Sequence, residues 1–187
     1  MRVIAGSHRG RRLESPLGTA IRPTADRTRE AVFNIIAHAG WCSDGTPILT
    51  GARVLDAFCG SGALGLEALS RGAAACTFLD SDSGALDCTR RNLAAMKEEP
   101  RATLIRANSL KPPPAREPVS LAFLDPPYGR DLSGPALIAL NDQGWFAPGA
   151  VIMVETAERD PWQTPAFCDL LDQRLYRLTW VRFLKRR

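Results

Sequence analysis

The 187-residue chain lacks most of the features that mark membrane, secreted or metal-binding proteins. No apolar run approaches the ~20 residues that a bilayer-spanning helix needs, and the first residues turn polar too early for a secretory signal. Its five cysteines are odd in number and scattered, with no Cys-x-x-Cys pair. We therefore expect no zinc site and no disulfide framework, and a reducing cytoplasm is the expected location. The two histidines, His8 and His38, have no partner in sequence, and we interpret both as structural or surface residues.

Positive charge is concentrated at the N-terminus. Residues 1–30 contain seven arginines and three acidic residues, which accounts for the whole net charge of +4. All but three of the 24 basic residues are arginine, which pairs with phosphate and stacks on bases better than lysine does. The excess predicts a basic arm that binds nucleic acid, with a solvated charged surface as the alternative. The predicted RNA-binding residues are Arg9, Arg11, Arg12, Arg22, Arg27 and Arg29.

The rest of the chain alternates between strand and helix patterns. Residues 2–5 and 11–14 are expected to pair as a short hairpin, and Thr24 is expected to cap a helix that runs to about Ala39. The expected strands are Arg53–Ala57, Cys76–Asp80, Thr103–Ala107, Val119–Leu124 and Val151–Glu155. The expected helices are Ala63–Arg71, Ser83–Lys97, residues 135–142 and a short one at Phe167–Gln173. A final strand or hairpin is expected within Leu175–Leu184. This alternation predicts an α/β fold with a mostly parallel sheet, which binds ligands at the carboxyl ends of its strands.

The most informative stretch is Asp125-Pro126-Pro127-Tyr128, which follows an apolar strand pattern. Two consecutive prolines remove two backbone donors and fix two φ angles, so the strand must end there in a rigid turn. The Asp125 carboxylate and the Pro126 carbonyl can each accept one N–H of an exocyclic amine, while the Tyr128 ring stacks on the base. With both hydrogens held, the nitrogen lone pair can face an electrophile. The tetrapeptide therefore predicts a catalytic group that holds the amine of a flat heterocycle.

A second motif follows the first strand of the alternating region. Gly60, Gly62 and Gly65 fit G-x-G-x-x-G, and Asp80 lies twenty residues after Gly60, where a carboxylate can hold ribose hydroxyls. A dinucleotide would fit equally well, except that Asp56 would repel a pyrophosphate. An acid suits the ammonium and sulfonium groups of S-adenosylmethionine, which is the predicted cofactor. The predicted cofactor-binding residues are Asp56, Phe58, Gly60, Ser61, Gly62, Asp80, Ser81, Asn108 and Ser109.

These motifs resemble those of class I S-adenosylmethionine-dependent methyltransferases. Within that group the chain resembles the bacterial RsmD family, which methylates the N2 amine of a guanine in small-subunit (16S) ribosomal RNA. The more family-specific segments are Arg2-Val3-Ile4-Ala5-Gly6, Arg9-Gly10-Arg11-Arg12-Leu13 and Arg22-Pro23-Thr24. Two positions depart from the family pattern: Asn108 stands where the family has an acid, and Arg177 where it has glycine.

The resemblance implies a Rossmann-like fold with a seven-stranded, mostly parallel sheet and helices on both faces. It further implies one domain over residues 1–187, in which a basic arm and helix (1–40) pack on a catalytic core (52–187). No metal is implied. The implied partner is 16S ribosomal RNA, within a small ribosomal subunit or an assembly intermediate, and the expected state is a monomer.

Other functions use similar motifs. A DNA methyltransferase acting on adenine N6 or cytosine N4 could use the same tetrapeptide, but such enzymes usually add a target-recognition region, and nothing longer than the thirty-residue arm lies outside the core. A non-catalytic RNA-binding assembly factor would predict a damaged motif, and both motifs are intact. Protein glutamine methyltransferases usually carry Asn where Asp125 stands. A dinucleotide-binding oxidoreductase leaves Asp56 and the two prolines unexplained.

Overall fold

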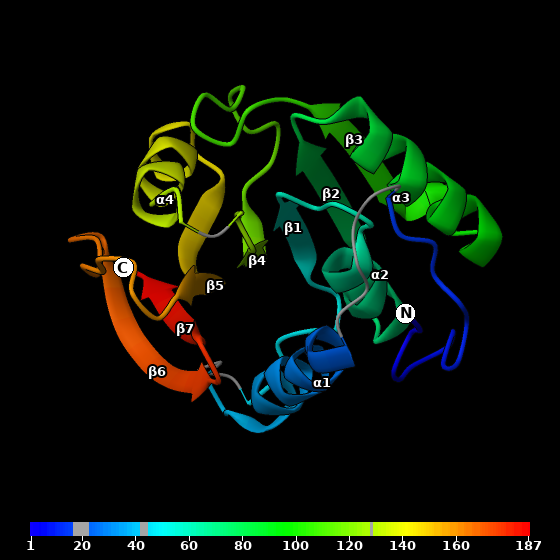
Figure 1. Cartoon of the computed structure of the whole chain (residues 1–187), viewed down its shortest axis with the longest axis horizontal. Helices are drawn as coiled ribbons and strands as arrows, with labels where there is room; N and C mark the ends of the chain where they lie inside the picture. Colours follow the sequence, from blue (N-terminus) through cyan, green and yellow to red (C-terminus); the bar gives the residue numbers. More distant parts are fainter. Residues whose placement is uncertain (17–22, 42–44, 128) are drawn as a thin grey trace.

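The computed structural model describes residues 1–16, 23–41, 45–127 and 129–187, without the side chains of residues 23–26. Its centre is a seven-stranded sheet of order β3-β2-β1-β4-β5-β7-β6 (Figure 1). The strands are β1 (Arg53–Ala57), β2 (Ala75–Asp80), β3 (Ala102–Arg106), β4 (Val119–Leu124), β5 (Phe146–Ala157), β6 (Cys168–Tyr176) and β7 (Thr179–Arg186). Strands β1 to β5 run parallel to one another, and β7 runs antiparallel to both β5 and β6.

Helices cover both faces of this sheet. They are α1 (Pro23–His38), α2 (Ala63–Ser70), α3 (Ser83–Met96) and α4 (Ser133–Asp142), with a short 3₁₀ helix η1 (Glu99–Arg101) after α3. Residues of α1, α2 and α3 share one hydrophobic core with one face of the sheet, and residues of α4 share a second core with the other face. This arrangement confirms the predicted Rossmann-like α/β fold.

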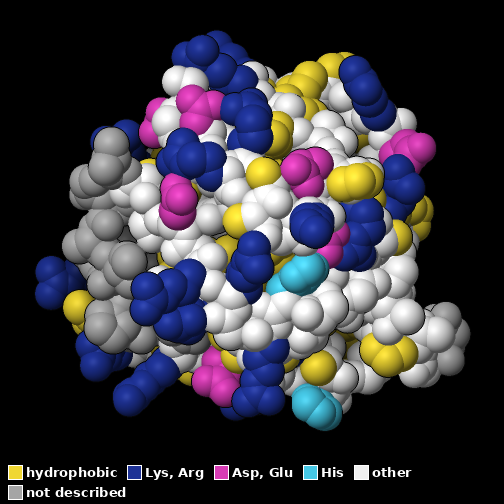
Figure 2. Space-filling model, turned by 90° about the vertical axis from the view of Figure 1, so that its right-hand side faces the viewer, with side chains coloured by type: hydrophobic (Ala, Val, Ile, Leu, Met, Phe, Trp, Pro, Cys, Tyr) yellow, Lys and Arg dark blue, Asp and Glu magenta, His cyan; other side chains and the backbone are white. Residues whose placement is uncertain are grey.

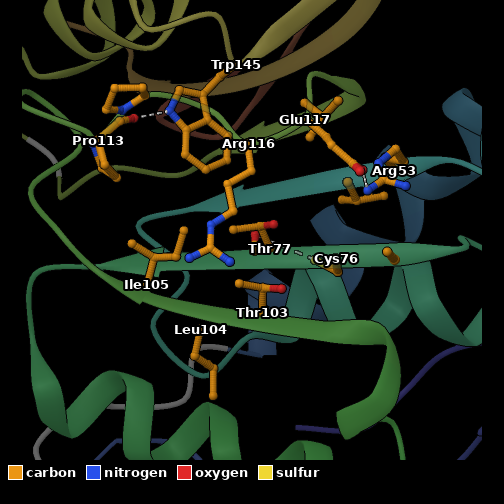
Figure 3. Close-up of a pocket in the computed structure, with 14 residues that line it drawn as sticks. Arg53, Cys76, Thr77, Thr103, Leu104, Ile105, Pro113, Arg116, Glu117 and Trp145 are labelled. Atoms are coloured by element: carbon orange, nitrogen blue, oxygen red, sulfur yellow. Dashed lines mark hydrogen bonds and ion pairs between the residues drawn. The ribbon is translucent and has the colours of Figure 1, made fainter.

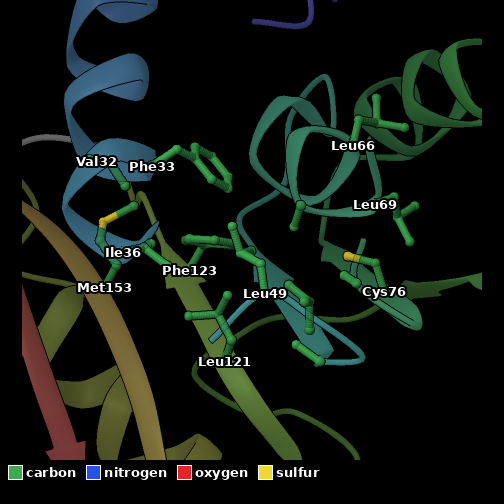
Figure 4. Packing of buried hydrophobic residues seen from close by; sticks show 14 of the residues in the cluster. Val32, Phe33, Ile36, Leu49, Leu66, Leu69, Cys76, Leu121, Phe123 and Met153 are labelled. Carbon is green, nitrogen blue, oxygen red and sulfur yellow. The ribbon is translucent and has the colours of Figure 1, made fainter. Parts of the chain in front are cut away.

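The first core is built around α1 and the middle of the sheet. Val32, Phe33 and Ile36 are buried on one face of α1 and point toward the sheet (Figure 4). The ring centroids of Phe33 and Phe123 lie 5.4 Å apart, a tilted aromatic contact. Each such side chain contributes roughly 1.5–3 kcal/mol when fully buried. The helix is therefore held on the sheet by its apolar face.

Two local expectations were wrong. The segment predicted as a helix at Phe167–Gln173 is strand β6, because pairing with β7 supplies its backbone hydrogen bonds. A shift in register between Leu170 and Asp172 interrupts the alternation by which a strand is usually recognised. Helix α1 begins at Pro23, so Thr24 lies inside it and does not precede it as a cap. Proline suits a first helical position because its missing N–H would have no partner there.

The N-terminal arm is tied to α2. The predicted hairpin forms as a short antiparallel pairing, with a bridge between Arg2 and Arg12 and backbone hydrogen bonds from Val3 N to the Arg11 carbonyl and from Leu13 N to the Met1 carbonyl, each at 3.0 Å. Glu67, buried on α2, accepts hydrogen bonds from Ile4 N at 2.7 Å and Ala5 N at 3.0 Å. Gly6 has φ of +81°, and a Cβ there would lie 1.9 Å from the Ser70 carbonyl oxygen. Only glycine fits this contact, which brings the arm against the helix that follows the glycine loop.

Candidate active site at the strand tips

Two carboxylates converge where the order of the sheet reverses. Strands β1 and β4 are neighbours, and Ala57 is paired with Leu124 at their carboxyl ends. Asp56 precedes Ala57 on β1, and Asp125 follows Leu124 directly after β4. Strand β2, on the other side of β1, ends at Asp80. Parallel α/β sheets bind ligands at such a reversal, so the structure brings together the key residues of both predicted motifs.

The loop between β1 and α2 has an unusual backbone. Phe58, Gly60 and Gly62 all have positive φ, at 60°, 55° and 75°. A left-handed conformation in a residue other than glycine costs on the order of 1 kcal/mol or more, and such strain gathers at functional sites. A Cβ on Gly62 would lie 2.8 Å from Cγ2 of Thr89, so glycine is also required there by packing. Nothing lies within 4 Å of a Cβ on Gly60, which leaves open space above the loop.

Asp56 supports the loop from beneath. Its side chain is 1% exposed, and Oδ2 accepts a hydrogen bond from Gly65 N at 2.8 Å. Burial raises the pKa of Asp56 well above its usual value, the Gly65 N–H opposes that rise, and the nearby Asp125 and Asp80 add to it. Asp56 thereby fixes the start of α2. Direct contact between Asp56 and a cofactor stays a prediction.

Asp80 links the tip of β2 to the same loop. Its Oδ2 accepts from Gly60 N at 3.0 Å, and its Oδ1 accepts from Asp82 N at 2.9 Å. Asp82 in turn caps α3 by accepting from Gly84 N. Each carboxylate oxygen can accept a second hydrogen bond, so Asp80 keeps acceptor capacity for ribose hydroxyls. The adjacent Ser81 is exposed.

Two polar residues of α3, which the sequence reasoning missed, hold the loop from the side. Asn92 Nδ2 donates to the Ser61 carbonyl at 2.9 Å and to the Glu14 carbonyl at 3.1 Å, and its Oδ1 accepts from Glu14 N at 2.8 Å. Thr89 Oγ1 donates to the Gly60 carbonyl at 3.1 Å. Asn92 therefore connects the arm to the glycine loop. Both residues lie on the otherwise apolar face of α3, which is the sequence signal that could have revealed them.

The residues after β3 form a local turn. Asn108 is exposed, and its Oδ1 accepts from Leu110 N at 2.9 Å, which makes a local turn. Ser109 is buried. This geometry fits a structural turn without a ligand, and the predicted adenine contact of both residues stays a prediction.

Asp125 lies at the end of β4 with its side chain open to solvent. Desolvation by the surrounding protein raises the pKa of Asp125 to about 6. Strand β4 ends at Leu124, as the two prolines predict, with Pro126 buried and Pro127 exposed just beyond it. Tyr128 lies outside the described residues.

The basic arm contributes most of the predicted arginines to the surface. Lys and Arg side chains are spread, among acidic ones, over one side of the molecule (Figure 2). The exposed predicted residues are Arg9, Arg11, Arg12 and Arg27. Arg29 is a correction: it is buried, and its Nη2 donates to the Arg2 carbonyl at 2.6 Å, so it faces the interior and not a phosphate. Arg22 lies outside the described residues.

Other chemistry is not evident at the strand tips. Burial raises the pKa of the Cys59 thiol, which keeps this loop residue protonated and a poor nucleophile. Within residues 1–16, 23–41, 45–127 and 129–187, no three His, Cys, Asp or Glu residues gather in a way that could hold a metal ion. In the same ranges, no helix is long and apolar enough to cross a bilayer.

A hollow of about 460 Å³ lies at the opposite end of the sheet, near the starts of β1, β2 and β3 (Figure 3). Arg116 extends over it toward Thr77 and Thr103. Trp145 Nε1 donates to the Pro113 carbonyl at 2.9 Å beside it. Because this hollow is separated from the strand tips by the length of the strands, it forms no part of the candidate active site.

Comparisons with known proteins agree with this geometry. A family model described as "Conserved hypothetical protein 95" matches residues 1–185. The chain is 39% identical over 157 residues to the "Ribosomal RNA small subunit methyltransferase D" of Escherichia coli K12, covering 83% of this chain and 74% of that protein. It is 36% identical over 178 residues to the protein of the same name from Haemophilus influenzae, covering 93% and 88%.

Solved structures show the same architecture. The structure of yhhF from Escherichia coli superposes with a TM-score of 0.82 at 35% identity, covering 100% of this chain and 97% of that one. The tRNA m1G37 methyltransferase of M. jannaschii matches with a TM-score of 0.63 at 15% identity, covering 89% of this chain and 51% of that one. The latter likeness shows the fold alone.

Proposed function

The chain belongs to the RsmD family, and from this premise we propose that it transfers a methyl group from S-adenosylmethionine to the exocyclic N2 amine of a guanine in small-subunit (16S) ribosomal RNA. The observation that carries the proposal is the position of Asp125, one strand away from the glycine loop across the reversal of the sheet. A group that holds an amine and a loop that holds a methyl donor are thus neighbours.

The residues of the glycine loop fit this cofactor. Open space lies above Gly60, and Asp80 at the next strand tip retains acceptor capacity for ribose hydroxyls. The carboxylate of Asp80 disfavours a pyrophosphate and favours a ligand with cationic groups. When bound, S-adenosylmethionine supplies an electrophilic methyl group. The remaining predicted contacts are Phe58, Ser61, Gly62, Ser81, Asn108 and Ser109.

The tetrapeptide orients the target amine. Asp125 and the Pro126 carbonyl each accept one N–H of the amine, the turn at Pro127 fixes their positions, and Tyr128 stacks on the base. As the nitrogen takes the methyl group, the carbon–sulfur bond of the donor would break and leave a neutral thioether, and the Asp125 carboxylate would stabilise the positive charge that develops on the nitrogen. A single well-placed electrostatic group of this kind contributes about 10²–10³ in rate. The proton then leaves the methylated ammonium to water, so no separate base is required.

The proposed partner is 16S ribosomal RNA within a small subunit or an assembly intermediate, bound by a monomer in the cytoplasm. The exposed arginines Arg9, Arg11, Arg12 and Arg27 are suited to phosphates. The second candidate function, a DNA amino-methyltransferase, would use the same tetrapeptide. The identity of the methylated nucleoside distinguishes the two functions.

The test is identification of the methylated nucleoside. Purified protein and S-adenosylmethionine with a labelled methyl group are offered to unmethylated small subunits, to their naked RNA and to genomic DNA. We expect N2-methylguanosine from the ribosomal samples. Label in DNA adenine or cytosine would favour the DNA enzyme, and cofactor binding without any transfer would favour a non-catalytic binding factor.

A further inference from the structure

The position of the proposed cofactor restricts where the rest of the substrate can lie. The glycine loop and Asp80 occupy the tips of β1 and β2, and Asp125 lies at the tip of β4. RNA on one side of the target base can therefore extend past the tips of β4 and β5, away from the cofactor. The chain leaves those tips as residues 129–132, which lead to α4, and as residues 158–167, which lead to β6.

A groove of about 600 Å³ lies between these two segments. Its walls are the first half of α4, with Gly134 and the 52% exposed Ile138, and the connection that contains Trp162, Gln163 and Thr164. Ser133 Oγ at the start of α4 donates to the Glu155 carbonyl at 3.3 Å, near the end of β5. This contact holds one wall of the groove to the strand beside β4, at the edge of the sheet where Asp125 lies.

One face of the Trp162 ring, which lines this groove, packs against the buried guanidinium of Arg182. The guanidinium of Arg182 lies 4.6 Å from the Trp162 ring and 5.2 Å from the Trp180 ring. Arg182 is 5% exposed, donates through Nη1 to Thr156 Oγ1, and has no hydrogen-bond partner for Nε among the described residues. A cation fixed under one face of an indole weakens the attraction of its other face for a second cation and leaves it suited to a neutral aromatic ring.

The polar groups around Trp162 suit a base better than a phosphate. Asp131, which lines the groove, repels phosphate and can accept an N–H from a base. Gln163 and Thr164 also line the groove and offer an amide and a hydroxyl, and the Thr164 hydroxyl accepts a hydrogen bond from Trp162 Nε1 at 3.3 Å. Positive charge lies outside the groove, on the exposed Arg130 and Arg159 of the two flanking segments. Base inside and phosphate outside is the arrangement of single-stranded RNA on an aromatic platform.

We propose that this groove binds a nucleotide next to the target guanine, with its base stacked on Trp162 and its phosphates at Arg130 and Arg159. The inference rests on the proposed function, because it assumes RNA with its reacting base at Asp125. It adds a binding site for a flanking nucleotide, which would hold the strand in place while the target base is turned out of its stack.

Kinetics with unmethylated small subunits test the proposal. Stacking of a base on an aromatic side chain contributes to the binding free energy, so Trp162→Ala should raise KM for the subunits about tenfold. We expect kcat and the Kd for S-adenosylmethionine to stay within about twofold of wild type, and Trp162→Phe, which keeps a ring, to recover most of the affinity. An unchanged KM in a folded Trp162→Ala protein would overturn the proposal.

A second variant covers the case in which removing Trp162 unfolds the protein. Ile138 is exposed on the opposite wall, so Ile138→Glu places a negative charge in the groove without disturbing the core. We expect it to raise KM for the subunits by about threefold or more through charge repulsion. The matched control is Leu170→Glu, an apolar residue on β6 that is 44% exposed and does not line the groove, for which KM should not change. Equal effects of the two substitutions would contradict the proposal.

Failure of the proposed function is distinguishable from failure of this inference. If wild-type protein does not methylate small subunits, the proposed function fails first. The groove is then tested by direct binding of a labelled single-stranded RNA of about twelve nucleotides, within the site sizes of such proteins. Loss of that binding in Trp162→Ala but not in Leu170→Glu would support an RNA groove, and equal binding by both would reject it.

Discussion

Replacing Gly65 by alanine should separate the packing role of the glycine motif from its ligand role. A Cβ at Gly65 would lie 2.4 Å from Cε1 of Phe78 and 2.6 Å from Sγ of Cys76, against about 3.5–4.0 Å for an ordinary contact. Both neighbours are buried on β2, so α2 must move away from the sheet by about 1 Å or more. Such overpacking costs about 1–3 kcal/mol, and the better helix propensity of alanine returns up to about 1 kcal/mol.

We therefore expect Gly65→Ala to lower the free energy of unfolding by about 1–2 kcal/mol and Tm by about 2–8 °C, for a chain of this length. Thermal and urea unfolding without cofactor measure this change. The matched control is Gly134→Ala in the first turn of α4, where nothing lies within 4 Å of a new Cβ. It should leave stability unchanged or raise it by about 0.5 kcal/mol. If Gly65→Ala were as stable as Gly134→Ala, the close approach of α2 to β2 would be refuted.

Four further predictions concern other parts of the molecule. Arg177 has φ of 59° in the turn between β6 and β7, so Arg177→Gly should raise the free energy of unfolding by about 0.5–1 kcal/mol in urea titrations. Glu67→Gln breaks a buried network, so it should lower the free energy of unfolding by about 3 kcal/mol and speed amide hydrogen exchange in the arm. Glu14→Gln, in an exposed ion pair, should lower it by less than about 1 kcal/mol. The pKa of Asp125 is raised to about 6, so its carboxylate becomes protonated below that pH and kcat/KM should fall as pH falls through about 6. The native protein binds this proton more tightly than the unfolded chain does, so the free energy of unfolding should decline as pH rises from about 4, the ordinary pKa of Asp, to about 6. Arg12→Gln should reduce the slope of log affinity for RNA against log salt by about 1.

The strand tips were the part of the fold that the sequence predicted best, because their signals are local. The β4 strand ends where two prolines stop it, and its predicted range, Val119–Leu124, matches the structure. The spacing from Gly60 to Asp80 reflects one helix and one strand in succession after β1, which places both residues at the same edge of the sheet. Such features depend on a few adjacent residues and are readable without tertiary contacts.

The rest depended on contacts between distant segments. Strand β6 takes its hydrogen bonds from β7, and a bulge hides its alternation, so its sequence resembles a short helix. Glu67 binds backbone N–H groups of the arm more than sixty residues away, and Asn92 binds a backbone carbonyl of the glycine loop about thirty residues away. No local sequence pattern shows such contacts. Arg29 could be recognised as an arginine of a basic arm, but its burial depends on how α1 packs. Asp56 was placed correctly at a strand tip, while its bond to Gly65 N required the structure.

The most direct test of the account is methyl transfer by Asp125→Asn, measured together with its Kd for S-adenosylmethionine. Asparagine keeps the size of the side chain but removes the charge that stabilises the developing ammonium. Asp142→Asn, at the end of α4, serves as the control. The account predicts that transfer to small subunits falls about 10²–10³-fold in Asp125→Asn, with Kd unchanged and the control fully active. Transfer at the wild-type rate in Asp125→Asn, or a loss explained by weaker cofactor binding, would contradict the proposed role of Asp125.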